Sequence, residues 1–158
     1  MLRKMLIAAA ALAVPAAAIA APPAMFLREA IQGNFSEVTL GRIIQNRGAS
    51  PQVRQFGAML VRDHSNGLAQ AQRIAARLHL RIPATLAPEA RRERMLLRNL
   101  SGRAFDREVR RYMINDHLKD IAAFRAQARS GDRATAGYAA ATVPVMQHHL
   151  AMARAIRG

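Results

Sequence analysis

Apolar side chains recur at three- and four-residue intervals along almost the whole chain, which is the spacing of one face of an α-helix. The sequence contains no stretch in which apolar and polar residues alternate with β-branched enrichment, the pattern typical of a strand. The chain is therefore predicted to be all-α, with four long helices and one short one. The expected helices span residues 24–47, 51–80, 88–100, 103–129 and 133–157.

Helix start and stop signals separate these segments. Gly48 is a C-terminal stop, and Ser50-Pro51 combines a capping serine with a proline at the first helical position. Asp132 is expected to cap the last helix, in which Pro144 predicts a kink. Because most connections are short, we predict a four-helix bundle in up-down-up-down order. The short basic helix is then an insertion between the second and third long helices.

Each long helix carries an ionisable side chain within its apolar stripe, where a polar residue is informative. Glu37 lies in the stripe of the first long helix, His64 in that of the second, and His117 in that of the third. The last helix is apolar nearly all round, so either His148 or His149 faces inward.

Counting from the predicted turns places these side chains at similar heights. At 1.5 Å per residue, Glu37 and His64 differ by roughly 6 Å, and His117 and His149 by roughly 5 Å. One carboxylate and three imidazoles in one layer form a plausible ligand set for zinc, iron, manganese or copper. The alternative is a structural polar layer, in which Glu37 pairs with a histidine and sets the helix register.

Three further acidic residues are less strongly indicated as members of such a site. Asp63 and Asp116 directly precede His64 and His117, so each is either an outer ligand or a helix-surface acid. Asp106 lies about 16 Å along the helix axis from His117 and cannot share a site with it. We therefore expect Asp106 to be a first-turn residue favoured by the helix dipole.

The N-terminus has the form of a secretory signal peptide over residues 1–20: two cationic residues, an apolar run over 5–14, and Ala-x-Ala at 18–20. Cleavage would leave one domain over residues 21–158, secreted across the inner membrane to the periplasm or outer envelope. The alternative is an uncleaved membrane anchor, because the uncharged run over 5–27 is long enough to span a bilayer.

Charge and composition limit the classes of binding partner that fit this chain. The net charge is +14, and loss of Arg3 and Lys4 with the leader would make it +12. Such a charge favours anionic envelope surfaces such as lipid head groups or polysaccharide. Nucleic acid is a poor fit for an exported chain that is only 4% aromatic and has no recognition motif. The chain has no cysteine, which excludes disulfides and a lipid anchor on the mature N-terminus.

Catalytic motifs are absent. The sequence contains no cysteine nucleophile, no G-x-S-x-G, no glycine-rich phosphate loop and no H-E-x-x-H. The Glu-x-x-His pairs of di-iron carboxylate bundles are also missing. We therefore expect no catalytic residues and favour a role that is not enzymatic.

Several short motifs, in their order and spacing, resemble a bacterial envelope family, the domain of unknown function 4142. They are residues 26–30, 37–38, 40–41, 53–56, 59 with 63–64, 82–83, 101–106, 112–113, 116–117 and 144 with 149–151. The resemblance covers residues 25–156. It implies a ferritin-like four-helix bundle in the periplasm or outer envelope, and no defined molecular function. The family's recurring polar positions match Glu37, His64, Asp106, His117 and His149, which favours His149 over His148 as the inward residue.

Two functional hypotheses remain. In the first, the protein binds a metal ion through Glu37, His64, His117 and His149. In the second, it is an envelope-interaction protein whose arginine-rich segment, residues 91–111, docks on an anionic surface. Neither the oligomeric state nor a protein partner can be predicted from the sequence.

Overall fold

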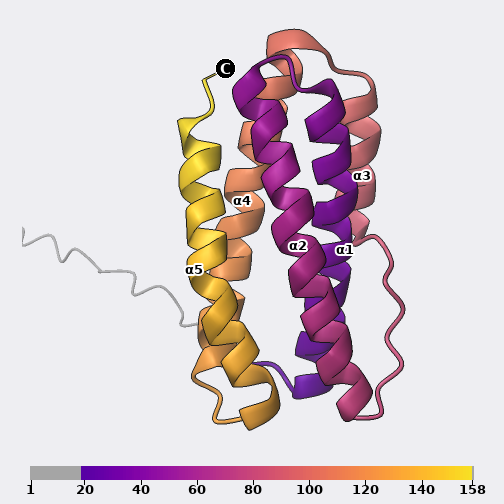
Figure 1. Cartoon of the computed structure of the whole chain (residues 1–158), viewed down its shortest axis with the longest axis vertical. Coiled ribbons are helices and arrows are strands. Elements are labelled where there is room, and N and C mark those ends of the chain that lie inside the picture. The colour runs from indigo at the N-terminus through magenta and orange to yellow at the C-terminus, as the bar shows by residue number, and fades with distance from the viewer. Residues whose placement is uncertain (1–18, 158) are drawn as a thin grey trace, which may run out of the picture.

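A computed structural model describes residues 19–157, which form five α-helices and no strand (Figure 1). The prediction of an all-helical chain is confirmed. Most of the predicted signal peptide, residues 1–18, lies outside the described residues. No helix within the described part combines the length and apolar character needed to cross a membrane. The helices are α1 (Pro23–Arg47), α2 (Pro51–Arg77), α3 (Pro88–Arg98), α4 (Gly102–Ala128) and α5 (Arg133–Ala155).

The predicted helix caps form as expected. The Ser50 hydroxyl accepts a hydrogen bond from the Val53 N–H at 3.2 Å, and the Asp132 carboxylate accepts one from the Thr135 N–H at 2.8 Å. α2 ends three residues earlier than predicted, because His79 has a left-handed backbone with φ of 55°. The N–H of Leu80 then donates to the carbonyl of Ala75 at 2.9 Å, which closes the last turn.

The order of the four long helices differs from the prediction. The backbone N–H groups of Ala49 and Ser50, in the α1–α2 turn, donate to the carboxylate of Asp106 at the start of α4. At the opposite end, the rings of Phe26 and Phe124 are 4.9 Å apart, near the start of α1 and the end of α4. α2 and α4 therefore begin at the same end and run in the same direction (Figure 1).

The predicted up-down-up-down order is thus wrong, and the order of the long helices is up-down-down-up. The prediction treated the segment between α2 and α4 as a local insertion. In the structure, residues 78–87 and α3 together return the chain along the length of the molecule, so that α4 starts beside α2 (Figure 1).

α1 packs chiefly on α2, and α4 on α5. The first pair approaches closely at Gly41 and Gly57: a Cβ at Gly57 would lie 2.7 Å from the Gly41 carbonyl oxygen and 2.4 Å from the Gln45 nitrogen. Because backbone atoms fill this space, only glycine fits at position 57. The contact holds α1 and α2 at a fixed separation about two turns from His64.

The apolar core consists of two clusters, one toward each end of the molecule. One includes Leu40, Leu60, Met113 and Ala153, and the other includes Ile31, Ala71, Ile121 and Met146. On α1, α2 and α4, Glu37, His64 and His117 lie between the members of these two clusters. On α5, His149 lies where the clusters meet, between Met146 of one and Ala153 of the other. A polar layer therefore crosses the middle of the core.

We expect Asp106→Ala to lower the free energy of unfolding by about 1–3 kcal/mol, because two N–H groups lose a charged acceptor. Asp106→Asn keeps the shape and one acceptor oxygen, so it should lose less. Urea denaturation followed by circular dichroism measures both effects. An unchanged unfolding free energy for Asp106→Ala would contradict the assignment of this residue to the α1–α2 turn.

Candidate metal centre

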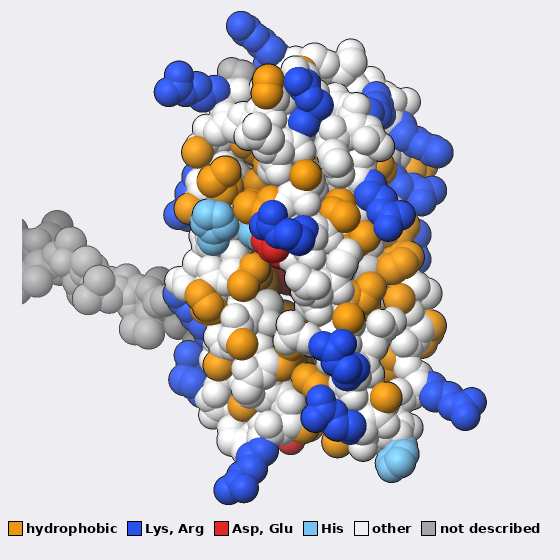
Figure 2. Space-filling view, in the orientation of Figure 1, with side chains coloured by type: hydrophobic (Ala, Val, Ile, Leu, Met, Phe, Trp, Pro, Cys, Tyr) orange, Lys and Arg blue, Asp and Glu red, His pale blue; other side chains and the backbone are white. Residues whose placement is uncertain are grey.

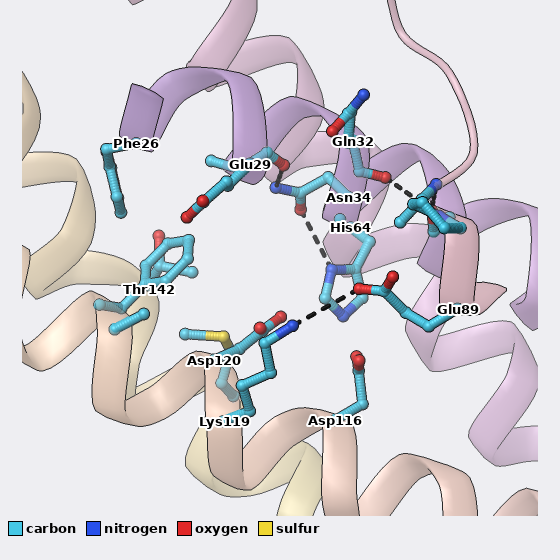
Figure 3. Close-up of a pocket in the computed structure, with 18 of the residues that line it drawn as sticks. Phe26, Glu29, Gln32, Asn34, His64, Glu89, Asp116, Lys119, Asp120 and Thr142 are labelled. Atoms are coloured by element: carbon cyan, nitrogen blue, oxygen red, sulfur yellow. Dashed lines mark hydrogen bonds and ion pairs between the residues drawn. The ribbon is translucent and has the colours of Figure 1, made fainter. Parts of the chain in front are cut away.

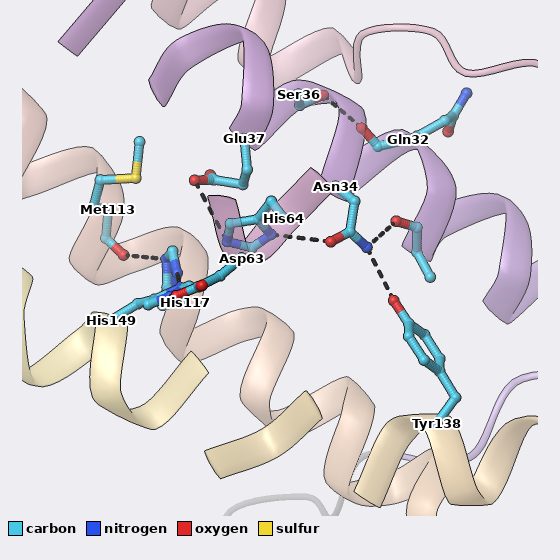
Figure 4. A network of polar contacts seen from close by, with 11 residues as sticks. Gln32, Asn34, Ser36, Glu37, Asp63, His64, Met113, His117, Tyr138 and His149 are labelled. Atoms are coloured by element: carbon cyan, nitrogen blue, oxygen red, sulfur yellow. Dashed lines mark hydrogen bonds and ion pairs between the residues drawn. The ribbon is translucent and has the colours of Figure 1, made fainter. Parts of the chain in front are cut away.

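The structure brings together all four residues selected from the sequence, one from each long helix (Figure 4). Glu37, His64, His117 and His149 are 2%, 8%, 2% and 0% exposed. The three imidazole ring centres are 5.1–5.8 Å apart. One ligand atom from each histidine lies within 4.8 Å of the others. His148 is exposed, so His149 is the inward residue of α5.

His117 and His149 are each held by an outer hydrogen-bond acceptor. His117 Nδ1 lies 3.0 Å from the carbonyl oxygen of Met113, which can only accept, so Nδ1 carries the proton. His149 Nε2 lies 3.0 Å from Asp63 Oδ2 and donates in the same way. The remaining nitrogens, His117 Nε2 and His149 Nδ1, therefore both carry lone pairs, and they face each other at 3.3 Å.

Asp63 remains an acceptor in this arrangement. Burial raises the pKa of its carboxyl group, but hydrogen bonds from Arg62 and His149 outweigh burial and hold the pKa below its usual value. Asp63 contacts His149 on the side of the ring away from His117. The predicted alternative that it is an outer ligand stays a prediction.

His64 is oriented by Asn34 of α1. The amide nitrogen of Asn34 donates to the Ala30 carbonyl at 2.7 Å and to the Tyr138 hydroxyl at 3.0 Å, so its oxygen is an acceptor. His64 Nδ1 lies 3.1 Å from that oxygen and donates to it. Gly67 makes room for Asn34, because a Cβ there would lie 2.4 Å from the Asn34 oxygen.

The other nitrogen of His64 faces the carboxylate of α1. His64 Nε2 lies 3.9 Å from Glu37 Oε2, and both atoms are buried without a hydrogen-bond partner among the described residues. All three imidazoles thus donate through one nitrogen to a fixed acceptor and leave the other nitrogen free to coordinate. This outer hydrogen bonding is typical of metal-binding histidines.

Burial keeps the imidazoles neutral. Burial and the neighbouring His149 lower the pKa of His117 to about 3. Burial and the neighbouring histidines lower the pKa of His64 well below its usual value, and burial lowers the pKa of His149. At neutral pH each ring therefore keeps a lone pair, which a metal ion requires. Burial and the nearby Asp116 raise the pKa of the Glu37 carboxyl group.

Asp116 belongs to a second group of possible ligands. Ligand atoms of Glu37, Asp116 and His117 also lie within 4.8 Å of one another. His117 has only one lone pair, at Nε2, so the two groups cannot each hold an ion through this residue. The two groups of possible ligands therefore belong to one site, at which Asp116 can supply an additional oxygen. Asp106 takes no part in this site, as expected from its distance along α4. The expected first-turn role is wrong, because Asp106 lies beyond the first turn, is buried and accepts hydrogen bonds from the α1–α2 turn.

Asn34 and Tyr138 were not among the residues predicted from the sequence to belong to the site. A signal for Asn34 was present, because it lies three residues before Glu37 on the same helix face and is an amide within an apolar stripe. Tyr138 gave no such signal. Its contact with Asn34 spans 104 residues of sequence and exists only because α1 and α5 pack together.

In the metal-free protein at neutral pH, we expect His64 and His117 in the Nδ1–H form and His149 in the Nε2–H form. Long-range ¹H–¹⁵N NMR correlations distinguish the two forms. Asp63→Ala removes the acceptor at Nε2, so His149 should switch to Nδ1–H and donate to His117. The proposed set of lone pairs is excluded if wild-type His149 is already in the Nδ1–H form.

A comparison with family models matches residues 8–156, nearly the whole chain, to a domain of unknown function. No curated protein and no solved structure matches the chain. The ferritin-like fold and the envelope location implied by the sequence resemblance stay predictions. The chain belongs to the domain of unknown function 4142 family.

Proposed function

We propose that this protein binds one transition-metal ion at the layer formed by Glu37, His64, His117 and His149. One observation carries the proposal: three neutral imidazoles offer nitrogens within 4.8 Å of one another, and each ring is fixed by an acceptor on its other nitrogen. Glu37 adds a carboxylate on the fourth side, next to His64.

A purely structural polar layer explains these contacts less well. Such a layer is stable when its members satisfy one another, and an unpartnered buried polar atom costs about 1–3 kcal/mol. Here His64 Nε2 and Glu37 Oε2 are both buried and unpartnered among the described residues. The two nitrogens that face each other at 3.3 Å both carry lone pairs. A cation would accept electron pairs from all four groups.

The ligand set favours zinc. Three imidazole nitrogens and one carboxylate oxygen are borderline donors that match tetrahedral Zn²⁺, and Asp116 could raise the coordination number for iron or manganese. At a given site Zn²⁺ binds more tightly than Mn²⁺ or Fe²⁺ in the usual order of affinities. Copper remains an alternative from the same ligands.

The test is metal binding by untagged protein that has been stripped and reconstituted with Zn²⁺. We expect one ion per chain by elemental analysis. His64→Ala and His117→Ala should each weaken binding about 100-fold or more, because losing even an outer hydrogen-bond partner costs about 10- to 100-fold.

His148→Ala is the matched control, because it removes an exposed imidazole next to His149 on the same helix. It should leave zinc affinity unchanged. Reconstituted wild-type protein that holds no metal would rule out the proposal, and so would His64 and His117 variants that bind as tightly as the His148 variant.

We also propose a ferritin-like fold and an exported protein. The fold assignment is supported by the single long crossover between α2 and α4, since ferritin-like bundles have one such connection. Export to the periplasm or outer envelope is supported by the sequence pattern of residues 1–20. A metal site in that compartment would fill from the external metal supply.

A second candidate function is docking on an anionic membrane surface through α3. One observation favours it: Met95 and Leu96 are 66% and 43% exposed, beside exposed Arg91, Arg92 and Arg98. Apolar side chains among cations are typical of helices that lie at a lipid interface.

Vesicle sedimentation with mixed phosphatidylglycerol and phosphatidylcholine tests this docking. We expect binding that weakens as salt rises, because surface charges are screened over about 8–10 Å at 0.1–0.15 M salt. Replacing Arg91, Arg92 and Arg98 with glutamine should weaken it further, while the same change at Arg129, at the end of α4, should have little effect. Vesicle binding that does not change with salt concentration would refute the electrostatic mechanism.

A further inference from the structure

A pocket of about 220 Å³ lies between α1 and α4, next to the start of α3 (Figure 3). Its walls come from one face of α1, the first residues of α3 and the middle of α4. α1 and α4 touch at one end of the pocket, where the rings of Phe26 and Phe124 are 4.9 Å apart, and α3 packs against both helices at the other end. The pocket therefore follows from the crossover that places α3 beside both helices.

The pocket is acidic although the protein is strongly basic. Four of the ten acidic residues in the chain line it, and we call these the pocket carboxylates: Glu29, Glu89, Asp116 and Asp120. Among the described residues, no arginine lines the pocket. In the part of the chain that the structure describes, its single cationic residue is Lys119, whose Nζ lies 3.5 Å from the carboxylate of Glu89 at the exposed side.

The inner end of the pocket reaches the metal layer. His64 is one of its lining residues, and its unpartnered Nε2 points toward Asp116 (Figure 3). Asp116 in turn lies within 4.8 Å of ligand atoms of Glu37 and His117. The carboxylates thus form a continuous path from Glu89 at the surface, past Asp120 and Asp116, to the histidines.

The opposite face of the layer has fewer acidic side chains. A second opening, of about 500 Å³ between α2 and α5, also reaches His64 and His149. Within residues 19–157, Asp63 is the only acidic residue that lines it, and its carboxylate accepts hydrogen bonds from Arg62 and His149. Figure 2 shows this face, over which basic side chains are scattered and acidic ones are few.

We propose that the acidic pocket is a transit site for divalent cations, through which the metal ion enters the histidine layer. Asp120 and Asp116 hold the hydrated ion by their oxygens before Glu37 and the imidazoles replace its water. This inference rests on the proposed metal-binding function. Burial and the neighbouring Asp116 raise the pKa of the Asp120 carboxyl group to about 8, so this group attracts a cation most strongly above that pH. Ionised carboxylates in a cleft with low-dielectric walls concentrate cations, which raises association rates by about 10- to 1,000-fold.

Lys119 has the opposite effect. Its ammonium group neutralises Glu89 at the outer side of the pocket and repels an arriving cation. The proposal therefore predicts changes of opposite sign for two neighbouring residues of α4. Loss of the ionised Asp120 carboxylate should slow loading, and loss of the Lys119 ammonium group should accelerate it.

The experiment is stopped-flow loading of apo-protein with Zn²⁺ at low ionic strength, followed with a zinc indicator dye at a pH above the Asp120 pKa of about 8, where this carboxyl group is ionised. Asp120→Asn, which is nearly isosteric, should slow loading at least about tenfold, while one ion per chain still binds at equilibrium. Lys119→Gln should speed loading. Glu108→Gln is the matched control, because it removes the same charge from the same helix outside the pocket. It should leave the rate within about twofold of wild type.

The possible results distinguish a failure of the acidic pocket as the entry route from a failure of the metal site itself. If Asp120→Asn loads as fast as Glu108→Gln to full stoichiometry, the transit role is wrong and the metal site stands. If Asn66→Arg, at the α2–α5 opening, slows loading while Asp120→Asn does not, entry occurs on that side instead. If the wild-type protein takes up no zinc at equilibrium, the metal site and the transit site both fail.

Discussion

Three imidazoles and a carboxyl group are buried in the middle of an apolar core, and much of the structure around them compensates for that burial. Each imidazole needs a hydrogen-bond partner inside the protein, because water does not replace it there. Met113, Asn34 and Asp63 supply these partners from α4, α1 and α2. The helices are therefore held in one register by polar contacts as well as by apolar packing.

Two features of the surrounding structure are connected with these hydrogen bonds: the glycines between α1 and α2, and the division of the apolar core into two clusters. The close approach of α1 and α2 at Gly57 and the missing side chain at Gly67 allow Asn34 to reach His64. Apolar residues above and below the layer then pack as two separate clusters. Because the layer is enclosed on two sides by apolar side chains, a bound ion would face solvent through the α1–α4 and α2–α5 openings.

Charge is distributed unevenly over this molecule. Arginines cover much of the surface, yet four acidic residues meet in one pocket beside the buried layer. A basic surface repels cations at long range. If the buried layer holds a metal ion, as proposed, the acidic pocket supplies the local carboxyl groups that favour its approach. α3, with its exposed Met95 and Leu96, carries a distinct basic and apolar surface on the outside.

The amino-acid sequence by itself determined the helices and the residues of the polar layer. Helix periodicity, the caps at Ser50 and Asp132, and the polar residues in apolar stripes are local properties, so they could be read from neighbouring residues. Height along each helix follows from a constant rise per residue, which is why Glu37, His64 and His117 were placed in one layer correctly. Only the tertiary structure decided the helix order, because a linker and a short helix can either insert locally or cross the molecule. It alone also decided the tautomers, the contact between Asn34 and Tyr138, and the acidic pocket. These features depend on which residues from distant parts of the chain become neighbours, and no local pattern records that.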